Sequence, residues 1–253
     1  MPLIDPADLE LSCLRAFGVF AGQRVLEIGA GDGRLAWPLA AEAALWVAVD
    51  IDRDELEVAA ADQREHPLDP LRLLAADGQA LPLPPASFDL AFFTWSLCCV
   101  ARAGMGTALA EAGRVLRPGG QLLDLHPTAD LMRLEAWVAL RPDAPRDPPE
   151  PEAYQRVPLG ALAAPETPHD VRSATAALEA PGPALTLDQR ATFDYMYFFK
   201  DLDELTEYLE DNDELDLAGD DLLERALSSL STATTPAWLV LIQPVLVTRL
   251  RKR

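Results

Sequence analysis

Three glycines at alternate positions, Gly29, Gly31 and Gly33, are the residues whose spacing most clearly indicates chemistry. They follow the apolar run Val25–Ile28 and precede a helix-compatible stretch, Arg34–Ala44. Because glycine has no Cβ and accepts positive φ, such a loop lets a ligand approach the backbone. The N–H groups at a helix start favour anions and polar acceptors. We therefore predict that the loop binds a small molecule with carboxylate, phosphate or ribose oxygens.

The spacing differs from that of two well-known phosphate-binding loops. It is Gly-x-Gly-x-Gly rather than Gly-x-Gly-x-x-Gly, and no Lys-Ser or Lys-Thr pair follows. A tight strand-to-helix turn without a ligand is the alternative explanation for these glycines. Residues further along the chain weaken that alternative.

A carboxylate ends the next apolar run, since Leu45–Val49 is followed by Asp50. In nucleotide-binding βαβ units, an acid about twenty residues beyond the glycines accepts hydrogen bonds from ribose hydroxyls. The same acid would repel a phosphate. Asp50 therefore favours a nucleoside as the ligand.

Three more apolar runs predict further strands of the same sheet. Leu71–Ala75 is followed closely by Asp77, and Phe88–Thr94 comes after a proline-rich turn. Gln121–Leu125 follows the sequence Leu-Arg-Pro-Gly-Gly. Strands that alternate with helical segments in this way are typical of a parallel sheet covered by helices.

Taken in order, these segments closely resemble the class I S-adenosylmethionine-dependent methyltransferases, over residues 22–127. The resemblance rests on Val-Leu-Glu-Ile-Gly-Ala-Gly-Asp-Gly, Val-Ala-Val-Asp, Ala-Asp-Gly-Gln-Ala-Leu-Pro-Leu-Pro-Pro-Ala-Ser-Phe-Asp and Arg-Val-Leu-Arg-Pro-Gly-Gly. It implies an α/β fold with a doubly wound, seven-stranded, mostly parallel sheet whose last strand is antiparallel. It also implies S-adenosylmethionine as cofactor and S-adenosylhomocysteine as product.

The resemblance implies a role for each matched position of the glycine loop, Gly29–Gly33. Gly29, Ala30, Gly31 and Gly33 would admit the methionine moiety of the cofactor. Glu27 would hold the loop and the cofactor's amino group, directly or through water. Alternatively, Glu27 only caps the following helix, because acids near helix N-termini are favourable.

Further along the chain, the resemblance implies which residues would bind the nucleoside part of the cofactor. Asp50 would bind the ribose hydroxyls, with Ile51 against the adenine face. Asp77 would accept from the adenine amine, and the backbone N–H of Gly78 or Gln79 would meet a ring nitrogen. Thr94 and Trp95 would line the methionine end and the substrate opening.

His126 is the candidate catalytic residue, because it directly follows the fifth strand. The carboxyl ends of strands line the ligand crevice in such sheets, and a neutral histidine there could accept a proton from a hydroxyl or amine. A sulfonium methyl is already electrophilic, so the reaction mainly requires alignment and exclusion of water. The alternative is that His126 is only a polar strand-end group bonded to the backbone.

The cysteines and histidines predict no metal site, because three of each lie scattered without ligand spacing. Cys98 and Cys99 are adjacent. Their thiols could contact a substrate or a soft metalloid, although buried free cysteines usually behave as small hydrophobes. Neighbouring cysteines are also poor disulfide partners.

Length and charge limit the classes of function. With 253 residues, we expect one domain: a helical N-terminal cap (1–20), the cofactor-binding core (21–127) and a C-terminal half with substrate-side insertions (128–253). The formal net charge of −20 argues against nucleic acid, whose phosphates are neutralised by Lys and Arg. No apolar run is long enough to span a membrane, no signal-like segment is evident, and few cysteines fit the cytoplasm.

The C-terminal half carries patterns but no motif. They predict helices at Leu131–Leu140 and Val171–Glu179, a short strand at Val157–Ala161, and the last two strands at Leu185–Phe199 and Trp238–Thr248, the latter irregular or at an edge because of Pro244.

Between these strands, Asp201–Glu224 holds twelve acids and no base, and its apolar spacing predicts two amphipathic helices. They would form either a solvated face or a lid that selects a cationic acceptor.

The function predicted from the sequence is methyl transfer from S-adenosylmethionine to a small-molecule acceptor by in-line displacement. Two alternatives stay open at this point. One is a regulator or partner subunit that binds the cofactor without catalysis. The other is transfer of a different group from the same cofactor.

Overall fold

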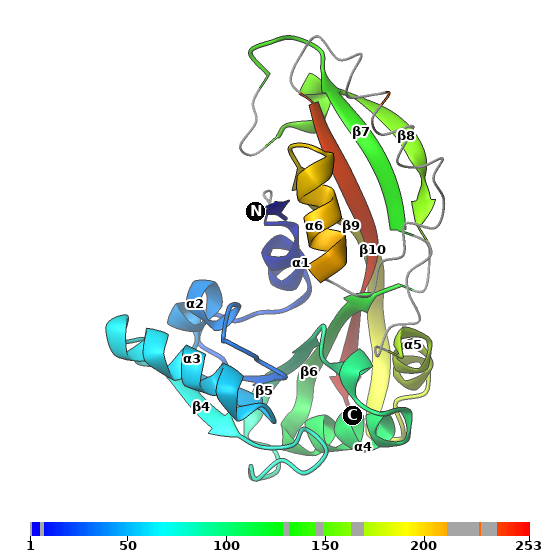
Figure 1. Ribbon diagram of the computed structural model, residues 1–253. Helices are drawn as coiled ribbons and strands as arrows, with labels where there is room; N and C mark the ends of the chain where they lie inside the picture. Colours follow the sequence, from blue (N-terminus) through cyan, green and yellow to red (C-terminus); the bar gives the residue numbers. More distant parts are fainter. Residues whose placement is uncertain are drawn as a thin grey trace. The chain divides into compact units, whose positions relative to one another are not determined.

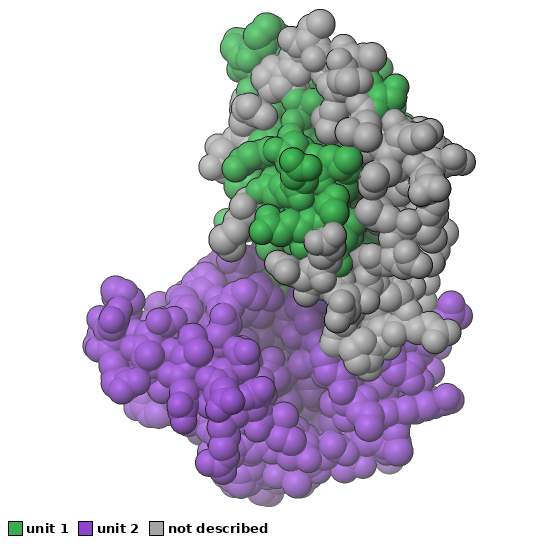
Figure 2. Space-filling model, in the orientation of Figure 1, with its two compact units in different colours: residues 1–10, 128–167, 193–245 green, residues 11–127, 168–192, 246–253 purple. Residues whose placement is uncertain are grey.

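The computed structural model describes residues 2–5, 8–128, 132–144, 149–162, 170–211, 228 and 237–253 (Figure 1). The chain forms two compact units, which Figure 2 colours separately. Unit 1 holds residues 1–10, 128–167 and 193–245, and unit 2 holds residues 11–127, 168–192 and 246–253. Two long strands, β9 (Leu185–Phe199) and β10 (Ala237–Lys252), have residues in both units.

The centre of unit 2 is a parallel sheet of five strands: β2 (Arg24–Ile28), β3 (Leu45–Asp50), β4 (Leu71–Ala75), β5 (Phe88–Thr94) and β6 (Leu116–Pro127). Their spatial order is β4-β3-β2-β5-β6, and β10 and β9 continue it beyond β6. The order therefore reverses between β2 and β5. Ligands of open α/β sheets bind at such a switch point, outside the carboxyl ends of the strands.

All five predicted core strands are confirmed, although β6 begins before the predicted Gln121. The helices of this part are α1 (Leu9–Phe17), α2 (Ala36–Leu39), α3 (Arg53–Glu65), α4 (Arg102–Val115) and α5 (Val171–Glu179). The helix predicted over Arg34–Ala44 is shorter than expected, since α2 passes into a 3₁₀ turn at Ala40–Glu42. The bounds of α5 agree with the prediction.

Both faces of this sheet are buried, so its strands are almost continuously apolar. On one face, Leu26, Ile28 and Phe93 belong to a cluster that also contains residues of α4 and α5. On the other, Trp46 lies 5.9 Å from Phe20 and 5.4 Å from the Phe92 ring, measured between ring centroids. These two layers hold the strand ends in fixed positions.

Asp89, at the start of β5, joins neighbouring strands. Its Oδ2 accepts from the backbone N–H of Arg24 on β2 at 2.8 Å, and its Oδ1 lies 2.8 Å from the Arg117 guanidinium. Arg117 begins the Arg-Pro-Gly-Gly turn of β6. One carboxylate thus connects β2, β5 and β6 at the edge opposite their carboxyl ends.

Unit 1 contains β1 (Leu3–Ile4), β7 (Met132–Ala139), β8 (Tyr154–Leu162) and α6 (Leu202–Asp211), besides parts of β9 and β10. β7 is antiparallel to both β8 and β10, and β1 is antiparallel to β9. With β1, β7 and β8 included, ten strands are hydrogen-bonded in the described residues. The predicted number, seven, is therefore too low.

The helix predicted over Leu131–Leu140 is wrong, because the segment forms β7. Both faces of β7 are buried: Leu134 and Ala136 belong to one apolar cluster, and Trp137 belongs to another. A strand buried on both sides loses the alternation of apolar and polar residues. Periodicity alone cannot then distinguish it from a buried helix.

Most other predictions for the C-terminal half are confirmed. β8 includes the predicted short strand, β9 has the predicted bounds, and β10 includes and extends the last predicted strand. β10 is not an edge strand. Pro244 lies just beyond its last registered pair with β7, Ile242↔Arg133, where the missing N–H removes no bond to β7.

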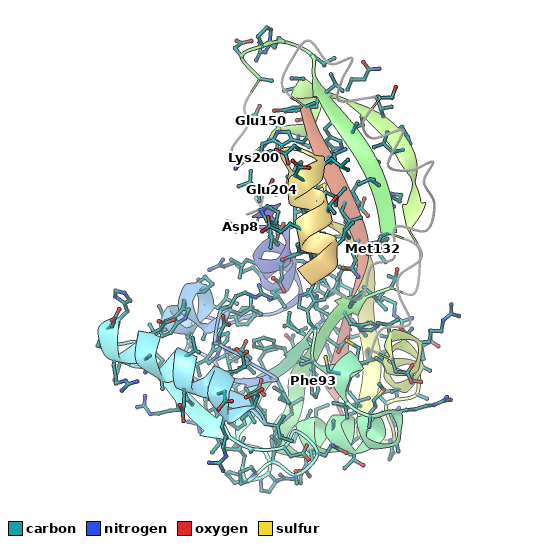
Figure 3. All side chains as sticks on the ribbon, in the orientation of Figure 1. Asp8, Phe93, Met132, Glu150, Lys200 and Glu204 are labelled. Carbon is teal, nitrogen blue, oxygen red and sulfur yellow. The ribbon has the colours of Figure 1, made fainter. Side chains whose placement is uncertain are left out.

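Helix α6 is the first of the two predicted acidic helices, and it begins with a reciprocal cap. The backbone N–H of Glu204 donates to the Asp201 carboxylate at 2.9 Å, and the Glu204 carboxylate accepts from the N–H of Lys200 at 2.8 Å (Figure 3). The arrangement differs from a capping box in one respect, because the Glu204 carboxylate binds the N–H of the residue before Asp201 rather than that of Asp201. The second predicted helix lies outside the described residues, and the single-domain organisation of the whole chain stays a prediction.

Candidate functional site

A cavity of about 670 Å³ lies in unit 2 at the carboxyl ends of β2, β3 and β5. Nine of the eleven predicted site residues line it: Glu27, Gly29, Ala30, Gly31, Asp50, Ile51, Asp77, Gly78 and Thr94. Gly33 and His126 are not among the lining residues. The fold thus gathers side chains and backbone from four separate segments around one space.

The glycine loop adopts the backbone that its sequence predicts, with positive φ at Gly29 (79°), Gly31 (54°) and Gly33 (82°). The N–H groups of Gly29 and Ala30 both donate to the carbonyl of Val49, at 2.8 and 3.0 Å. These bonds fix the loop against the end of β3.

The three glycines are required for different reasons. A Cβ on Gly29 would lie 2.2 Å from the Cβ of Ser96, and a Cβ on Gly33 would lie 3.3 Å from that of Ala59 on α3. Only Gly31 faces open space, with its nearest neighbour, Glu55 Oε2, at 4.0 Å. Gly31 is therefore the position where a ligand can reach the backbone, whereas Gly29 and Gly33 make room for protein atoms.

Asp50 holds the loop and keeps acceptor capacity for a ligand. Its Oδ2 accepts from the N–H of Gly31 at 2.7 Å, and its Oδ1 accepts from the N–H of Asp52 at 2.8 Å. An ionised carboxylate offers about four lone-pair sites, so these bonds use half of them. Two adjacent hydroxyls, as on a ribose, match the remaining acceptor sites.

Glu27 is buried beside the cavity, with only 2% of its surface exposed. Its Oε2 accepts from the indole N–H of Trp46 at 2.9 Å. The alternative role as a helix cap is wrong, because the N-cap of α2 is Leu35 and has no side-chain cap bond. Trp46 instead fixes the carboxylate at the inner wall of the cavity.

Asp77, Gly78 and Ile51 form the other end of the cavity. Asp77 Oδ1 accepts from the backbone N–H of Gln79 at 2.8 Å, which orients this carboxylate in the turn after β4. The Ile51 side chain is 71% exposed at the cavity wall. An exposed apolar side chain beside a carboxylate suits a flat ring that carries an amine.

Thr94 is the most direct sign that the cavity receives a ligand. Its hydroxyl is buried, and no atom in the described part of the chain hydrogen-bonds to it. A buried polar group without a partner costs about 1–3 kcal/mol. Thr94 lies next to Phe93 at the end of β5, and both line the cavity (Figure 3). A polar ligand atom or water there would satisfy the hydroxyl.

Trp95 lines the cavity as predicted, whereas sequence reasoning missed its neighbour Ser96. Ser96 occupies the space that Gly29 leaves open, and its hydroxyl donates to the carbonyl of Ile28 at 2.6 Å. Trp95 has a φ of 58°, which is unusual for a bulky residue. Neither contact of Ser96 has a local signal in the sequence, because Ser96 lies 67 positions from Gly29 and 68 positions from Ile28.

The structure does not place His126 at the cavity. The side chain is fully buried on β6, its Nδ1 is hydrogen-bonded to Asp124, and its Nε2 lies 2.9 Å from the Thr175 hydroxyl. Since that hydroxyl donates to the carbonyl of Val171, it accepts from Nε2–H. His126 thus connects β6 to α5, which gives no support to its predicted role as a general base.

We expect Thr175→Val to lower the free energy of unfolding by about 1–3 kcal/mol, because the near-isosteric change removes the hydroxyl that accepts from His126 and donates to Val171, and it leaves the buried His126 N–H without an acceptor. Thr175→Ser keeps the hydroxyl and is the matched control. Urea denaturation of both variants measures the difference. Equal stability of the two variants would show that the His126–Thr175 bond does not hold α5.

In the described part of the chain, no group of three or more His, Cys, Asp and Glu side chains is arranged to hold a metal ion. No helix there has the length and apolar character needed to cross a membrane.

The residues present fit S-adenosylmethionine. The open face at Gly31 accepts a close approach, Asp50 offers acceptors to paired hydroxyls, and Asp77 with Ile51 suits an aminated ring. The unpartnered hydroxyl of Thr94 lies on the same cavity. We find no lining residue whose chemistry conflicts with this cofactor.

Comparison with known proteins agrees with the site. The family model described as methyltransferase domain matches residues 25–120. The ubiquinone/menaquinone biosynthesis C-methyltransferase UbiE of Dinoroseobacter shibae is 39% identical over 109 residues, 42% of this chain and 43% of that protein. The fatty-acid O-methyltransferase of Mycolicibacterium smegmatis is 34% identical over 128 residues, which are 49% of this chain and 44% of that protein.

These matches thus cover less than half the length of either curated relative. Among solved structures, the [4+2]-cyclase SpnF shares the fold with a TM-score of 0.57 and 18% identity, over 97% of this chain and 81% of that one. Sequence motifs, cavity and family model agree over the same residues. Residues 25–120 therefore match a methyltransferase domain, and the fold around them is shared with solved methyltransferase-fold structures.

Proposed function

We propose that the protein transfers the methyl group of S-adenosylmethionine to a small-molecule acceptor by in-line displacement. The observation that carries the proposal is the convergence of Gly31, Asp50, Asp77 and Thr94 on one cavity. Each offers a group that a different part of this cofactor requires. When bound, the cofactor supplies an electrophilic methyl on a sulfonium.

The contribution of the chain is to bind, orient and exclude water. Asp50 is already oriented by Gly31 and Asp52, so its binding to ribose hydroxyls needs little rearrangement. Asp77 is similarly oriented by Gln79. Holding the methyl in line with an acceptor accounts for much of the rate enhancement in such reactions. No general base is assigned, since the one predicted from the sequence lies outside the cavity.

The acceptor class proposed here is a small apolar molecule with a nucleophilic carbon or oxygen. The names of the two relatives support it, since one is a C-methyltransferase of ubiquinone/menaquinone biosynthesis and the other is a fatty-acid O-methyltransferase. The cavity wall contains Phe93, Trp95 and Val100, which suit an apolar acceptor. The net charge of −20 makes a nucleic-acid acceptor unfavourable.

A second candidate is cofactor binding without methyl transfer. It is favoured by one observation, the similarity of fold to SpnF, which is a [4+2]-cyclase by name. Fold alone does not specify the reaction. The two candidates differ only in turnover and not in binding.

The test begins with calorimetric titration of the purified chain with S-adenosylhomocysteine, for which we expect one site per chain. A screen with radiolabelled S-adenosylmethionine against quinols, fatty acids, phenols and amines then measures methyl transfer. Label in the quinol or fatty-acid products supports the proposal. Binding without label in any product favours the second candidate, and no binding contradicts both.

A further inference from the structure

The side chain of Gln79 lies between the cavity and helix α4. Gln79 follows Asp77 and Gly78 in the turn after β4, and all three residues line the cavity. The backbone N–H of Ala80 donates to the carbonyl of Asp77 at 2.9 Å, which closes this turn. Gln79 itself is half-buried. Its side chain is thus placed to influence what the cavity accepts at this end.

Gln79 holds one oxygen of the Asp77 carboxylate with two donors. Asp77 Oδ1 accepts from the backbone N–H of Gln79 at 2.8 Å and from its side-chain Nε2 at 3.4 Å. Hydrogen bonds to a carboxylate are charge-assisted and add geometric specificity. With Oδ1 engaged, Oδ2 is the oxygen that can accept from a ligand amine. Because the N–H of Gln79 is used in this way, a ring nitrogen would meet the N–H of Gly78.

The position of the Gln79 amide depends on a glycine of α4. Gly104 is a buried residue in the first turn of this helix. A Cβ on Gly104 would lie 2.1 Å from Gln79 Oε1 and 2.7 Å from Gln79 Cδ, so the amide occupies the space of a missing side chain. The amide is the end of a flexible side chain and moves more readily than a helix backbone. Any side chain at position 104 would therefore displace the amide of Gln79.

We propose that Gln79 is the positioning residue through which Asp77 selects a ring with an exocyclic amine, and that Gly104 makes room for Gln79. This rests on the proposed function, because adenine is the ring of S-adenosylmethionine. The oriented Oδ2 of Asp77 accepts from the amine. A ring with a carbonyl oxygen at the same position has no donor there, and its oxygen would face a carboxylate. The cavity thus rejects deaminated nucleosides.

The orientation of Asp77 affects this specificity more than it affects binding as a whole. A site built to hydrogen-bond a donor rejects an analogue that lacks the donor, because the acceptor is then left unpaired. That rejection requires a carboxylate that cannot turn away. When the Gln79 amide is removed or displaced, Asp77 is free to turn toward solvent and no longer disfavours the carbonyl oxygen. The expected result is a change in specificity rather than a uniform loss of affinity.

The experiment is calorimetric titration of the purified full chain with S-adenosylhomocysteine and with S-inosylhomocysteine, in which a carbonyl oxygen replaces the amine. The measured quantity is the ratio of the two dissociation constants. For wild type we expect a ratio of about 100 in favour of the amine. For Gln79→Met, which keeps a long unbranched side chain but removes the amide, we expect the ratio to fall about fivefold, the effect of one hydrogen bond.

Gly104→Ala should lower the ratio by a similar factor, because the new Cβ displaces the amide. Gly106→Ala is the matched control on the same helix, since no atom lies within 4 Å of the position of its Cβ. We expect this control to keep the wild-type ratio. In a Gln79→Ala background, Gly104→Ala should cause no further fall, because no amide remains to be displaced, and a double-mutant cycle measures this coupling.

Two kinds of failure are distinguishable. A wild-type ratio near one, an unchanged ratio in Gln79→Met, or equal weakening for both ligands overturns the proposal and leaves the proposed function in place. If the wild-type chain binds neither ligand, the proposed function fails and the proposal fails with it. Urea denaturation checks that each variant is folded. Should Gly104→Ala not fold, the ratio in Gln79→Met decides alone.

Discussion

Gly29→Ala is expected to destabilise the protein by about 2–5 kcal/mol, the sum of a left-handed backbone penalty and an overpacking cost. The φ of 79° accounts for the first contribution. The second arises because the new Cβ would lie 2.2 Å from the Cβ of Ser96 and 2.7 Å from its Oγ. Urea denaturation measures the loss directly.

Gly22→Ala is the matched control for the backbone contribution. Gly22 has a similar φ of 68°, but no atom lies within 4 Å of the position of its Cβ. We therefore expect a loss of only about 1–2 kcal/mol. A double variant that adds Ser96→Gly to Gly29→Ala should recover part of the difference, which a double-mutant cycle isolates. Equal losses for Gly29→Ala and Gly22→Ala would contradict the steric account.

Asp50→Asn is expected to raise the dissociation constant for S-adenosylhomocysteine about 10- to 150-fold, because charged hydrogen bonds contribute about 1.5–3 kcal/mol. The change removes the charge that would accept from two hydroxyls. It also weakens the 2.7 Å bond from the Gly31 N–H, so the glycine loop itself becomes less ordered. Calorimetry gives the affinity of each variant.

The matched control is Asp52→Asn, the same chemical change two residues away. Asp52 is the N-cap of α3 and does not line the cavity. Asparagine is as good an N-cap as aspartate, so stability should be nearly unchanged. We expect the affinity of this variant to stay within about twofold of wild type, inside ordinary surface-mutation effects. Similar losses for both variants would mean that Asp50 acts only through overall charge.

The part of the site that lies at strand ends could be predicted from the sequence. Glu27 is the second-last residue of one apolar run, Asp50 and Thr94 stand at the ends of two others, and parallel strands bring their carboxyl ends to one edge of the sheet. The order of those runs, together with the resemblance, was enough to place nine residues on one cavity.

His126 shows where the same reasoning stops. It too follows an apolar run, but β6 continues to Pro127, so the histidine is a strand residue within the core. Its direction depends on α5, about fifty residues further along the chain. Sequence pattern gives a residue's place in a strand, whereas burial depends on which helix packs on it.

The strand β7 and the role of Ser96 could not be predicted, for related reasons. β7 is buried on both faces by segments from the C-terminal half, so its own pattern is ambiguous. The Ser96 side chain fills the space that a side chain on Gly29 would occupy, and the two residues are far apart in the sequence. Both are tertiary properties, and a single sequence without tertiary contacts does not reveal them.

The path of β10 has a consequence for synthesis on the ribosome. Leu250 is fully buried in the same apolar cluster as Leu26 of β2, and Arg249 donates to the Phe17 carbonyl at 2.8 Å. Nascent domains generally fold from the N-terminus as they emerge. Unit 2 departs from that order, since its first strands must wait for residue 250 before their core is complete. The apolar sheet surface that Leu250 covers therefore stays incomplete until the last part of the chain has been synthesised.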